Sequence, residues 1–314
     1  MRYYFAPMEG ITDSIYRRLH HKYFPGIDRY YMPFLSPTMH RTLSPKEKRE
    51  LPPANSVPFV AIPQILTKNA EDFLWAAALC QQLGYEEVNL NVGCPSGTVV
   101  SKGKGAGMLR SADELDAFFE KIFKESPISI SVKTRLGIEN VEEFPALLEV
   151  FNRYPIRELT VHPRVRKQFY NGSVDMAMFR YTAEHSKNSV CYNGNLTCLE
   201  DISAFSAQFP QIKAVMLGRG LIGDPGMLCP GGTTAETLEK FTTELLDAYI
   251  EAFGGTRNAM FRMKENWGFL LHRFEGSEKL GKQLRKTTDV EEYRALTAQI
   301  IHTLPLAEKL QADW

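Results

Sequence analysis

The sequence predicts an α/β protein, a (β/α)8 TIM barrel over residues 1–235 followed by a small all-helical domain over residues 236–314. Three observations lead to this prediction. Short apolar runs alternate with helix-like segments, polar side chains stand where those runs end, and the strand pattern stops after Gly231 and Gly232. The count of eight evenly spaced runs favours a closed barrel over a doubly wound open sheet.

The expected strands are rich in β-branched and aromatic residues, which suit a pleated and half-buried surface. They are Tyr3–Ala6, Arg29–Pro33, Phe59–Ile65, Glu87–Val92, Ile128–Thr134, Glu158–His162, Ser189–Asn193 and Ala214–Gly218. Helices are expected between them at Asn69–Leu83, Ala112–Lys124, Val141–Asn152 and Leu199–Phe209. After the second strand, prolines such as Pro37, Pro45 and Pro52 leave room for only a short helix.

The C-terminal part shows only helical patterns, with glycine pairs or a Gly-Ser step as breaks. The expected helices are Leu238–Phe253, Ala259–Phe274, Glu278–Lys286 and Val290–Leu304. Between Arg257 and Lys286 this part carries eight basic and only three acidic residues. Two interpretations stay open, a solvated helical surface and a face that contacts the phosphate backbone of a nucleic acid through residues such as Lys264 and Arg285.

Composition bounds the class of protein. The 314 residues include 37 basic and 37 acidic ones, with 44% hydrophobic and 24% charged, which is typical of a globular protein and excludes a disordered or collagen-like chain. No apolar run reaches the roughly 18–20 residues that cross a bilayer, and no signal segment is visible, so we expect a cytoplasmic protein. The five cysteines form no Cys-x-x-Cys pair, so we expect neither a disulfide framework nor a metal site.

Side chains with chemistry to offer follow nearly every expected strand. In a closed barrel these strand ends converge on one face, where barrel enzymes build their active sites. An open sheet would spread them along a line. In chain order they are Pro7, Met8 and Glu9, then Gln64, Asn91 with Cys94, Lys133 with Arg135, His162 with Arg164, Asn193 to Asn195, and Gly218 with Arg219.

The segment Gly218–Gly223 reads Gly-Arg-Gly-Leu-Ile-Gly, which matches the glycine spacing of a dinucleotide-binding turn. That fingerprint needs a second strand and an acidic residue further on, whereas this chain continues into helices. The alternative is the phosphate site that barrels build after strands seven and eight. Asn193-Gly194-Asn195 would then bracket the phosphate with Gly218, and Arg219 would be its cation; a plain tight turn is the other interpretation.

Four strand-end side chains each have a functional and a structural interpretation. Lys133 ends an apolar strand and suggests an anionic ligand or a structural ion pair. His162 suits a ligand contact or an internal hydrogen bond, and Gln64 and Asn91 suit a heterocyclic edge or a tie between barrel loops. His20 and His21 are expected on a surface helix with no role.

Cys94 lies between Gly93 and Pro95, which fix the loop after the fourth strand. A cysteine there is a candidate nucleophile, metal ligand or proton donor. The sequence around Cys94 lacks the His or Asp spacing that would indicate a nucleophilic dyad. It also lacks a second cysteine that would indicate a metal site. A thiol with an ordinary pKa of about 8.5 stays mostly protonated at neutral pH, which suits a general acid.

Several segments, in order along the chain, resemble the signature of the tRNA-dihydrouridine synthases. They are Ala6–Asp13, Asn91–Ser96 followed by Gly103–Leu109, Val132–Gly137, Val161–Arg164 with Gln168–Gly172, Asn193–Asn195 and Gly218–Gly220. The segments Arg262–Trp267 and Leu280–Arg285 are similar to that family's helical domain more loosely. Departures are Gly97, Pro163 and Met176, where members often have lysine, glycine and tryptophan, and these bear on which uridine is chosen.

The resemblance implies an FMN-dependent enzyme that reduces uridine in tRNA to 5,6-dihydrouridine, with NADPH reducing the FMN. FMN N5 would deliver hydride to C6 of the uracil, and Cys94 would protonate C5. The residues implied to hold FMN are Pro7, Met8, Glu9, Gln64, Lys133, His162, Asn193, Gly194, Asn195, Gly218 and Arg219. Asn91 would contact the uracil, with Arg164 and Arg166 near the RNA backbone and Lys264 and Arg285 in the helical RNA-binding domain.

Two other functions stay open from the residues alone. One is an FMN-dependent oxidoreductase of a small unsaturated substrate, which would need no RNA-gripping domain. The other is a non-catalytic RNA-binding protein on a barrel scaffold, which would bind no flavin.

Overall fold

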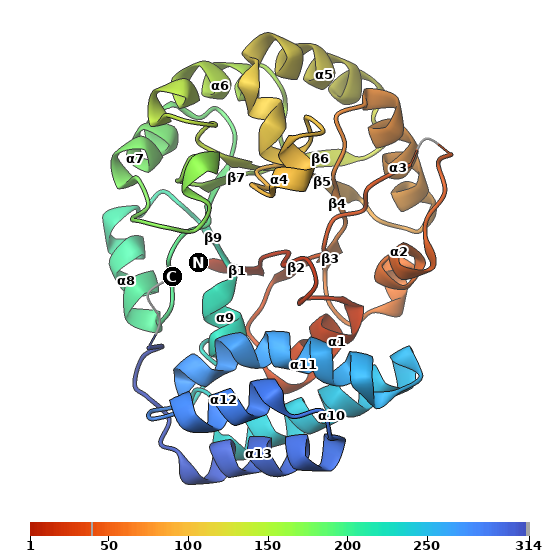
Figure 1. Ribbon diagram of the computed structural model, residues 1–314. Helices are drawn as coiled ribbons and strands as arrows, with labels where there is room; N and C mark the ends of the chain where they lie inside the picture. Colours follow the sequence, from red (N-terminus) through yellow and green to blue (C-terminus); the bar gives the residue numbers. More distant parts are fainter. Residues whose placement is uncertain (39, 312–314) are drawn as a thin grey trace.

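The computed structural model describes residues 1–38 and 40–311. Its strands are β1 (Arg2–Phe5), β2 (Arg29–Tyr31), β3 (Ala61–Ile62), β4 (Gln64–Ile65), β5 (Glu87–Val92), β6 (Ser129–Arg135), β7 (Leu159–His162), β8 (Val190–Tyr192) and β9 (Ala214–Leu217). They pair in parallel in the order β3-β2-β1-β9-β8-β7-β6-β5-β4. Figure 1 looks down the resulting barrel. The predicted α/β barrel is confirmed.

The third predicted strand is split in two. Its halves β3 and β4 flank Pro63, which has no backbone N–H to donate to a ladder. β3 pairs with β2 on one side and β4 pairs with β5 on the other, so the two ends of the sheet belong to one interrupted strand. The nine short strands therefore correspond to the eight predicted runs.

Helices surround the strands on the outside of the barrel (Figure 1). They are α1 (Ser14–Tyr23), α2 (Pro45–Glu50), α3 (Ala70–Gln82), α5 (Ala112–Glu125), α6 (Phe144–Phe151), α7 (Met176–His185) and α8 (Leu199–Gln208), with short α4 (Gly97–Val100) and α9 (Arg219–Gly223) in loops at the strand ends. Many of them start at a side chain that accepts a hydrogen bond from the first turn, as Asn69 does for α3 and Ser111 for α5. α7, with the sequence Met-Ala-Met-Phe-Arg-Tyr-Thr-Ala-Glu-His, was not among the helices named from the sequence.

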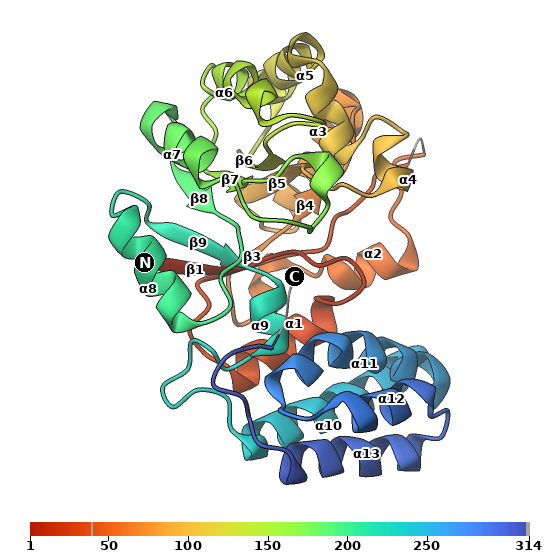
Figure 2. The same cartoon turned by 60° about the vertical axis from the view of Figure 1, so that its left-hand side comes forward.

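The C-terminal part is a bundle of α10 (Ala235–Phe253), α11 (Thr256–Leu270), α12 (Glu278–Lys286) and α13 (Val290–Thr303). These bounds confirm the predicted helices to within a few residues. Gly254 ends α10 with a φ of 66°, a left-handed conformation that glycine adopts without strain. Figure 2 shows the bundle to one side of the barrel, next to α1 and α9.

The bundle packs on the barrel through α1. The ring of Phe241 on α10 lies 5.5 Å from Tyr16 and 5.1 Å from Phe24, centroid to centroid. The Tyr249 hydroxyl donates to the Asp13 carboxylate at 3.0 Å, and Arg262 lies 3.8 Å from the same group. The bundle and barrel thus share a core, and the domain boundary at residue 235 stays a prediction.

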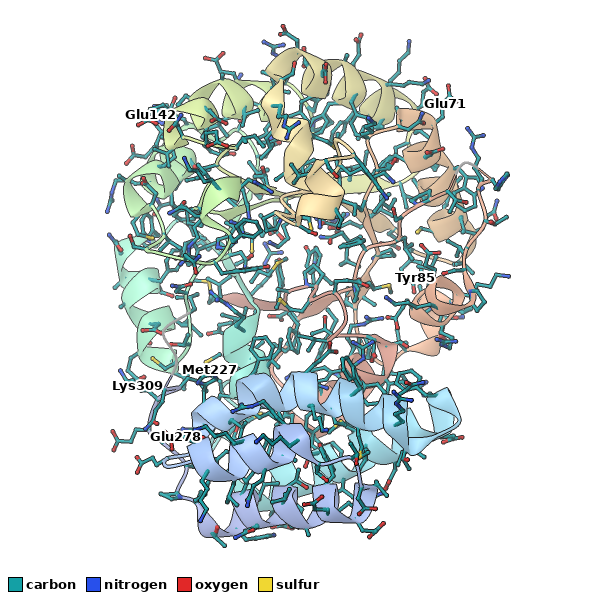
Figure 3. The ribbon with its side chains drawn as sticks, viewed as in Figure 1. Glu71, Tyr85, Glu142, Met227, Glu278 and Lys309 are labelled. Atoms are coloured by element: carbon teal, nitrogen blue, oxygen red, sulfur yellow. The ribbon has the colours of Figure 1, made fainter. Side chains whose placement is uncertain are left out.

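Side chains fill the space between strands and helices, while charged ones such as Glu71 and Glu142 point outward (Figure 3). Tyr4, Tyr31 and Met216 belong to a separate cluster inside the barrel. Residues along each strand point alternately into this cluster and toward the outer core, as expected for a barrel. The placement of His20 corrects the expectation of a surface residue. It is fully buried with Nδ1 at 2.9 Å from the Tyr30 hydroxyl, and burial lowers its pKa to about 3.

Within the described residues no group of His, Cys, Asp or Glu side chains is arranged to hold a metal ion, and no helix is long and apolar enough to span a membrane.

Candidate active site at the mouth of the barrel

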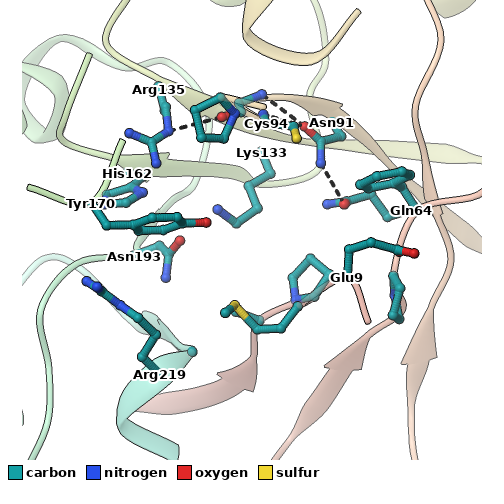
Figure 4. Close-up of a pocket in the computed structure, with 18 of the residues that line it drawn as sticks. Glu9, Gln64, Asn91, Cys94, Lys133, Arg135, His162, Tyr170, Asn193 and Arg219 are labelled. Carbon is teal, nitrogen blue, oxygen red and sulfur yellow. Dashed lines mark hydrogen bonds between the residues drawn. The ribbon is translucent and has the colours of Figure 1, made fainter. Parts of the chain in front are cut away.

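A pocket opens at the carboxyl ends of the strands (Figure 4). The cavity itself has a volume of about 230 Å³ and is open to solvent on one side. All eleven residues expected to hold FMN line it, together with Asn91 and Cys94. The other lining residues are Ala6, Pro33, Phe34, Gly93, Pro95, Arg135 and Tyr170.

Cys94 follows β5 in a loop that its neighbours hold in place. The Asn91 side-chain oxygen accepts from the backbone N–H groups of Gly93 and Cys94, at 3.0 and 2.9 Å. Gly105, at φ 57°, packs so closely that a Cβ there would lie 2.9 Å from the Cys94 carbonyl oxygen. Burial raises the pKa of the Cys94 thiol, against opposing effects from the Ser96 backbone and from nearby Arg135. The thiol is therefore protonated at neutral pH.

Gln64 and Asn91 belong to a chain of amide hydrogen bonds across the barrel. Asn91 Nδ2 donates to Gln64 Oε1 at 2.8 Å, and Gln64 Nε2 donates to Asn89 Oδ1 at 2.8 Å. Asn89 in turn donates to the Ser131 hydroxyl at 2.9 Å. The tie between barrel elements, one of the two interpretations from sequence, is thus present. The side-chain amides of Gln64 and Asn91, which line the pocket, each have a second N–H beyond the one used in this chain.

Lys133 reaches from β6 into the middle of the pocket, with Cys94 on one side and Arg219 on the other (Figure 4). Burial, together with the positive charge of Arg135, lowers the pKa of the Lys133 amine to about 8. No structural ion pair of Lys133 is present within residues 1–38 and 40–311. The interpretation of Lys133 as a contact to an anionic ligand stays a prediction.

His162 is held in one tautomer by its neighbour. The Arg164 guanidinium can only donate, so its Nη1, 2.9 Å from His162 Nε2, makes that nitrogen the acceptor. The hydrogen of the neutral ring is then on Nδ1. Burial, and the cations Arg135 and Lys133, lower the pKa of His162 well below its ordinary value, so the ring stays neutral.

Arg164 corrects a prediction. It was expected near the RNA backbone, but it is fully buried and donates to His162, to Asn195 Oδ1 at 3.2 Å and to the Gly172 carbonyl at 2.5 Å. Arg164 thus supports the pocket residues His162 and Asn195.

The loops after β8 and β9 form a cationic corner of the pocket. Asn195 Oδ1 accepts from Arg164 and also from Arg219 Nη2 at 3.3 Å. A Cβ on Gly220 would lie 2.5 Å from the Leu196 carbonyl oxygen, so the two loops can meet only because this residue is glycine. Burial and the nearby Arg164 lower the pKa of Arg219 to about 10. Two cations crowded together in this way favour an anion beside them.

The loop after β1 supplies Pro7, Met8 and Glu9. Met8 N–H donates to the Thr12 hydroxyl at 2.9 Å, which fixes the turn into α1. The Glu9 carboxylate turns toward Lys46, 2.6 Å away, at the rim of the pocket. Glu9 therefore lines the pocket by its position, while its charge is directed outward.

Sequence reasoning missed Tyr170 and assigned Arg135 no site role. Arg135 donates to the carbonyl oxygens of Gly93 and Val165 at 3.0 and 3.2 Å, which joins the Cys94 loop to the loop after β7. The Tyr170 ring lies between two guanidiniums, 5.3 Å from Arg135 and 4.8 Å from Arg219. The strand-end position signalled Arg135. Tyr170 lies in a loop, where no periodic pattern predicts which way a side chain points, so no signal in the sequence indicated it.

The three other residues expected to contact RNA lie outside the pocket wall. Arg166 is half-buried and donates to the Pro95 carbonyl at 3.2 Å, next to Cys94. Lys264 is half-buried and donates to the Thr287 carbonyl, so its amine ties α11 to the segment before α13. Arg285 is exposed on α12. Lys279, Lys282 and Lys286 are exposed at helical spacing on the same helix.

The chain is similar to dihydrouridine synthases over nearly its whole length. The family described as Dihydrouridine synthase (Dus) matches residues 4–304. A "Probable tRNA-dihydrouridine synthase" of Rhizobium leguminosarum bv. phaseoli is 26% identical over 310 residues, which cover 95% of this chain and 94% of that protein. The tRNA-dihydrouridine synthase B of Pasteurella multocida is 26% identical over 225 residues, which cover 71% of this chain and 67% of that protein.

Solved structures similar to this chain share its barrel. A complex of 2-naphthoyl-CoA reductase with 2-naphthoyl-CoA has a TM-score of 0.54 and 11% identity, covering 72% of this chain and 49% of that chain. Morphinone reductase has a TM-score of 0.51 and 11% identity, covering 72% of this chain and 84% of that chain. At such identities the similarity shows the fold alone.

Proposed function

The chain belongs to the dihydrouridine synthase family and is an oxidoreductase, and from this premise we propose that it reduces uridine in tRNA to 5,6-dihydrouridine, with FMN as its cofactor and NADPH as the reductant. The observation that carries the proposal is that Cys94, Lys133 and the cationic corner at Arg219 face one pocket. A proton donor, a cation for a flavin ring and a phosphate site are the three things this reaction needs from a protein.

The residues of the pocket fit FMN. The corner formed by Arg219, Asn195 and Gly218 offers guanidinium and loop groups for a phosphate at the position where barrels hold one. Lys133 stands in the middle of the pocket and offers a cation to the negative charge that a flavin ring acquires on reduction. The side chains of Gln64 and His162 add polar groups along the wall.

Bound FMN, reduced by NADPH, would supply a hydride to C6 of the uracil. The Cys94 thiol would donate its proton to C5, and the thiolate would regain a proton from water. Burial raises the pKa of the Cys94 thiol, so the thiol keeps its proton at neutral pH. Arg135 and Lys133 then stabilise the thiolate that remains.

The target base must leave its stack to enter the pocket. Arg135 donates to Gly93 beside Cys94, and Tyr170 packs on Arg135, so we place the uracil against these two side chains, with the spare N–H of Asn91 as a third polar partner. Arg285 and the lysines of α12 would contact the RNA backbone beyond the pocket. Half-buried Lys264 would position α12 through Thr287 instead.

The test uses the purified full chain with FMN, NADPH and an unmodified tRNA transcript. Dihydrouridine is measured by nucleoside mass spectrometry. We expect product with the wild-type protein and a loss of about 10²–10⁴-fold in rate for Cys94→Ala, the range that a general acid contributes. The flavin absorbance of the two proteins should be the same.

The matched control is Cys229→Ala. Cys229 is half-buried and contacts the Pro25 carbonyl, away from the pocket, so this variant should keep the wild-type rate. Wild-type protein that binds FMN and oxidises NADPH but forms no dihydrouridine would refute the proposed substrate. Cys94→Ala at full rate would refute the assigned proton donor.

A further inference from the structure

The loop after β7 makes a tight turn with a phenylalanine in an unusual position. The Asn171 N–H donates to the Gln168 carbonyl at 2.8 Å, which closes a four-residue β-turn. Phe169, its second residue, has φ 52° and ψ −101°. These angles are those of a type II′ turn, where glycine usually stands because a side chain is strained there. Within residues 1–38 and 40–311, Arg41 is the other non-glycine residue with a positive φ.

The strained turn presents the Phe169 ring to solvent. The residue is 39% exposed, although a large apolar side chain would be expected to turn inward. The Arg166 guanidinium lies over the ring, 5.1 Å from its centre. Arg166 is itself anchored, because its Nε donates to the Pro95 carbonyl at 3.2 Å. An aromatic ring backed by a cation is thus fixed to the loop that carries Cys94.

The next residue shows where this ring lies relative to the pocket. Tyr170 lines the pocket, with its ring between Arg135 and Arg219 (Figure 4). Phe169 itself does not line the pocket wall. Both aromatic side chains of the turn are exposed, Tyr170 by 41%, but only Tyr170 lines the pocket, and Phe169 faces solvent next to it.

We propose that Phe169, backed by Arg166, is a stacking subsite for the nucleobase next to the uridine that enters the pocket. This inference rests on the proposed function. When one base leaves its stack, its neighbour loses a stacking partner and exposes an aromatic face at the pocket mouth. A fixed aromatic ring can replace that partner, and a guanidinium next to it attracts the adjoining phosphate. The hydrogen bond that closes the turn and the guanidinium of Arg166 hold the ring outward in the absence of RNA.

The expected effect is on RNA binding. Base-aromatic stacking corresponds to about a 5- to 140-fold change in affinity. We expect Phe169→Gly to raise KM for the tRNA transcript within this range and to change kcat little. The rate of FMN reduction by NADPH, which needs no RNA, should be unchanged. Because glycine also relieves the turn, the melting temperature of this variant should not fall, which separates lost binding from lost folding.

Two further variants make the test specific. Phe169→Trp keeps an aromatic face and should restore a KM near the wild-type value. Leu199→Ala removes another exposed apolar side chain, 48% exposed at the start of α8, and should leave KM unchanged. A direct readout is a transcript with 2-aminopurine beside the reduced uridine, whose fluorescence should be quenched by the wild-type protein and less by Phe169→Gly.

The outcomes separate the two proposals. Wild-type activity with an unchanged KM in Phe169→Gly would overturn the subsite and leave the proposed function intact. Unchanged fluorescence with 2-aminopurine on either side of the uridine would overturn it as well. Absence of dihydrouridine in the wild-type reaction would overturn the proposed function and, with it, this subsite.

Discussion

Asn91 donates through Nδ2 to Gln64 Oε1 at 2.8 Å, while its Oδ1 accepts from the backbone of Cys94 at 2.9 Å. The Asn91 side chain thus links Gln64, on β4, to the loop that carries the Cys94 thiol. Asn91 was predicted to contact the uracil, and the spare N–H leaves that contact open. Its side-chain oxygen, however, accepts hydrogen bonds from the backbone of Gly93 and Cys94 and so holds Cys94 in position.

We expect Asn91→Ala to act mainly on kcat. Removing Oδ1 leaves two partly buried N–H groups without their acceptor, which costs about 1–3 kcal/mol of unfolding free energy. Displacing the thiol by about 1 Å lowers the rate by on the order of 10²-fold. Steady-state kinetics on the tRNA transcript checks this, with flavin content measured in parallel. A raised KM at unchanged kcat would instead mean that Asn91 serves as a substrate contact.

A matched control for this variant is Asn69→Ala. Asn69 caps α3 by accepting from the Asp72 N–H at 2.9 Å. Its loss costs about 1 kcal/mol of stability, comparable to the cost at Asn91. Turnover should be unaffected, so a fall in rate through general destabilisation would show in both variants.

Lys133 predicts a pH dependence of flavin reduction. Burial lowers the pKa of its amine to about 8, so the amine is charged below that pH and neutral above it. The cation favours negative charge on the flavin, so the rate of FMN reduction by NADPH should fall as the pH rises through about 8. Lys133→Arg keeps its charge to much higher pH and should not show the fall. Identical pH profiles of the two proteins, measured by stopped-flow absorbance, would contradict this assignment.

Gly220 predicts a steric effect at the cationic corner. Gly220→Ala would place a methyl group 2.5 Å from the Leu196 carbonyl oxygen and force apart the loops after β8 and β9. We expect a loss of about 1–3 kcal/mol of stability and weaker FMN binding, measured by thermal unfolding and fluorescence titration. Gly268→Ala on α11 is the control, because nothing lies within 4 Å of its added methyl group. Helix propensity should make that variant slightly more stable. Unchanged FMN affinity in Gly220→Ala would show that the corner does not hold the cofactor.

The architecture could be predicted because its signals are local. Most of the β-branched runs, such as Glu87–Val92, end at glycine or proline, and the structure has strands at all eight of them. The break at Pro63 could have been predicted from the missing N–H alone. The burial of His20 could not, because it depends on Phe5 and Tyr30, which reach it from other elements.

The site was predictable to the same extent. Residues at the carboxyl ends of strands, such as Lys133 in β6 and His162 in β7, face the pocket because parallel strands all end at one face. Arg164 is two residues beyond β7, and its direction is fixed by Asn195 and Gly172, which are distant or looped contacts. The directions of the Tyr170 and Phe169 side chains are set by a tight turn. Its backbone angles could not be predicted, because phenylalanine rarely adopts a positive φ. The directions of side chains within loops were therefore the part of the site that could not be predicted from the sequence.

Arg285 predicts a salt-dependent contribution to RNA binding. It is exposed on α12, whereas Lys264 is tied to Thr287, so Arg285→Ala tests the surface without loosening the bundle. Loss of one phosphate contact should weaken binding and reduce the slope of log K against log salt by about 0.7–0.9. Filter-binding titrations over a range of salt concentrations measure both quantities.

The control for Arg285→Ala is Lys124→Ala, an exposed cation at the end of α5, on the other side of the barrel from the bundle (Figure 1). That variant should keep both the affinity and the slope, because one surface charge far from the RNA is screened. Removing the whole bundle would be a poorer test, since Phe241 packs against Tyr16 and Phe24 and the cut would expose this shared core. Equal slopes in the Arg285 variant and the wild-type protein would make α12 an ordinary solvated surface.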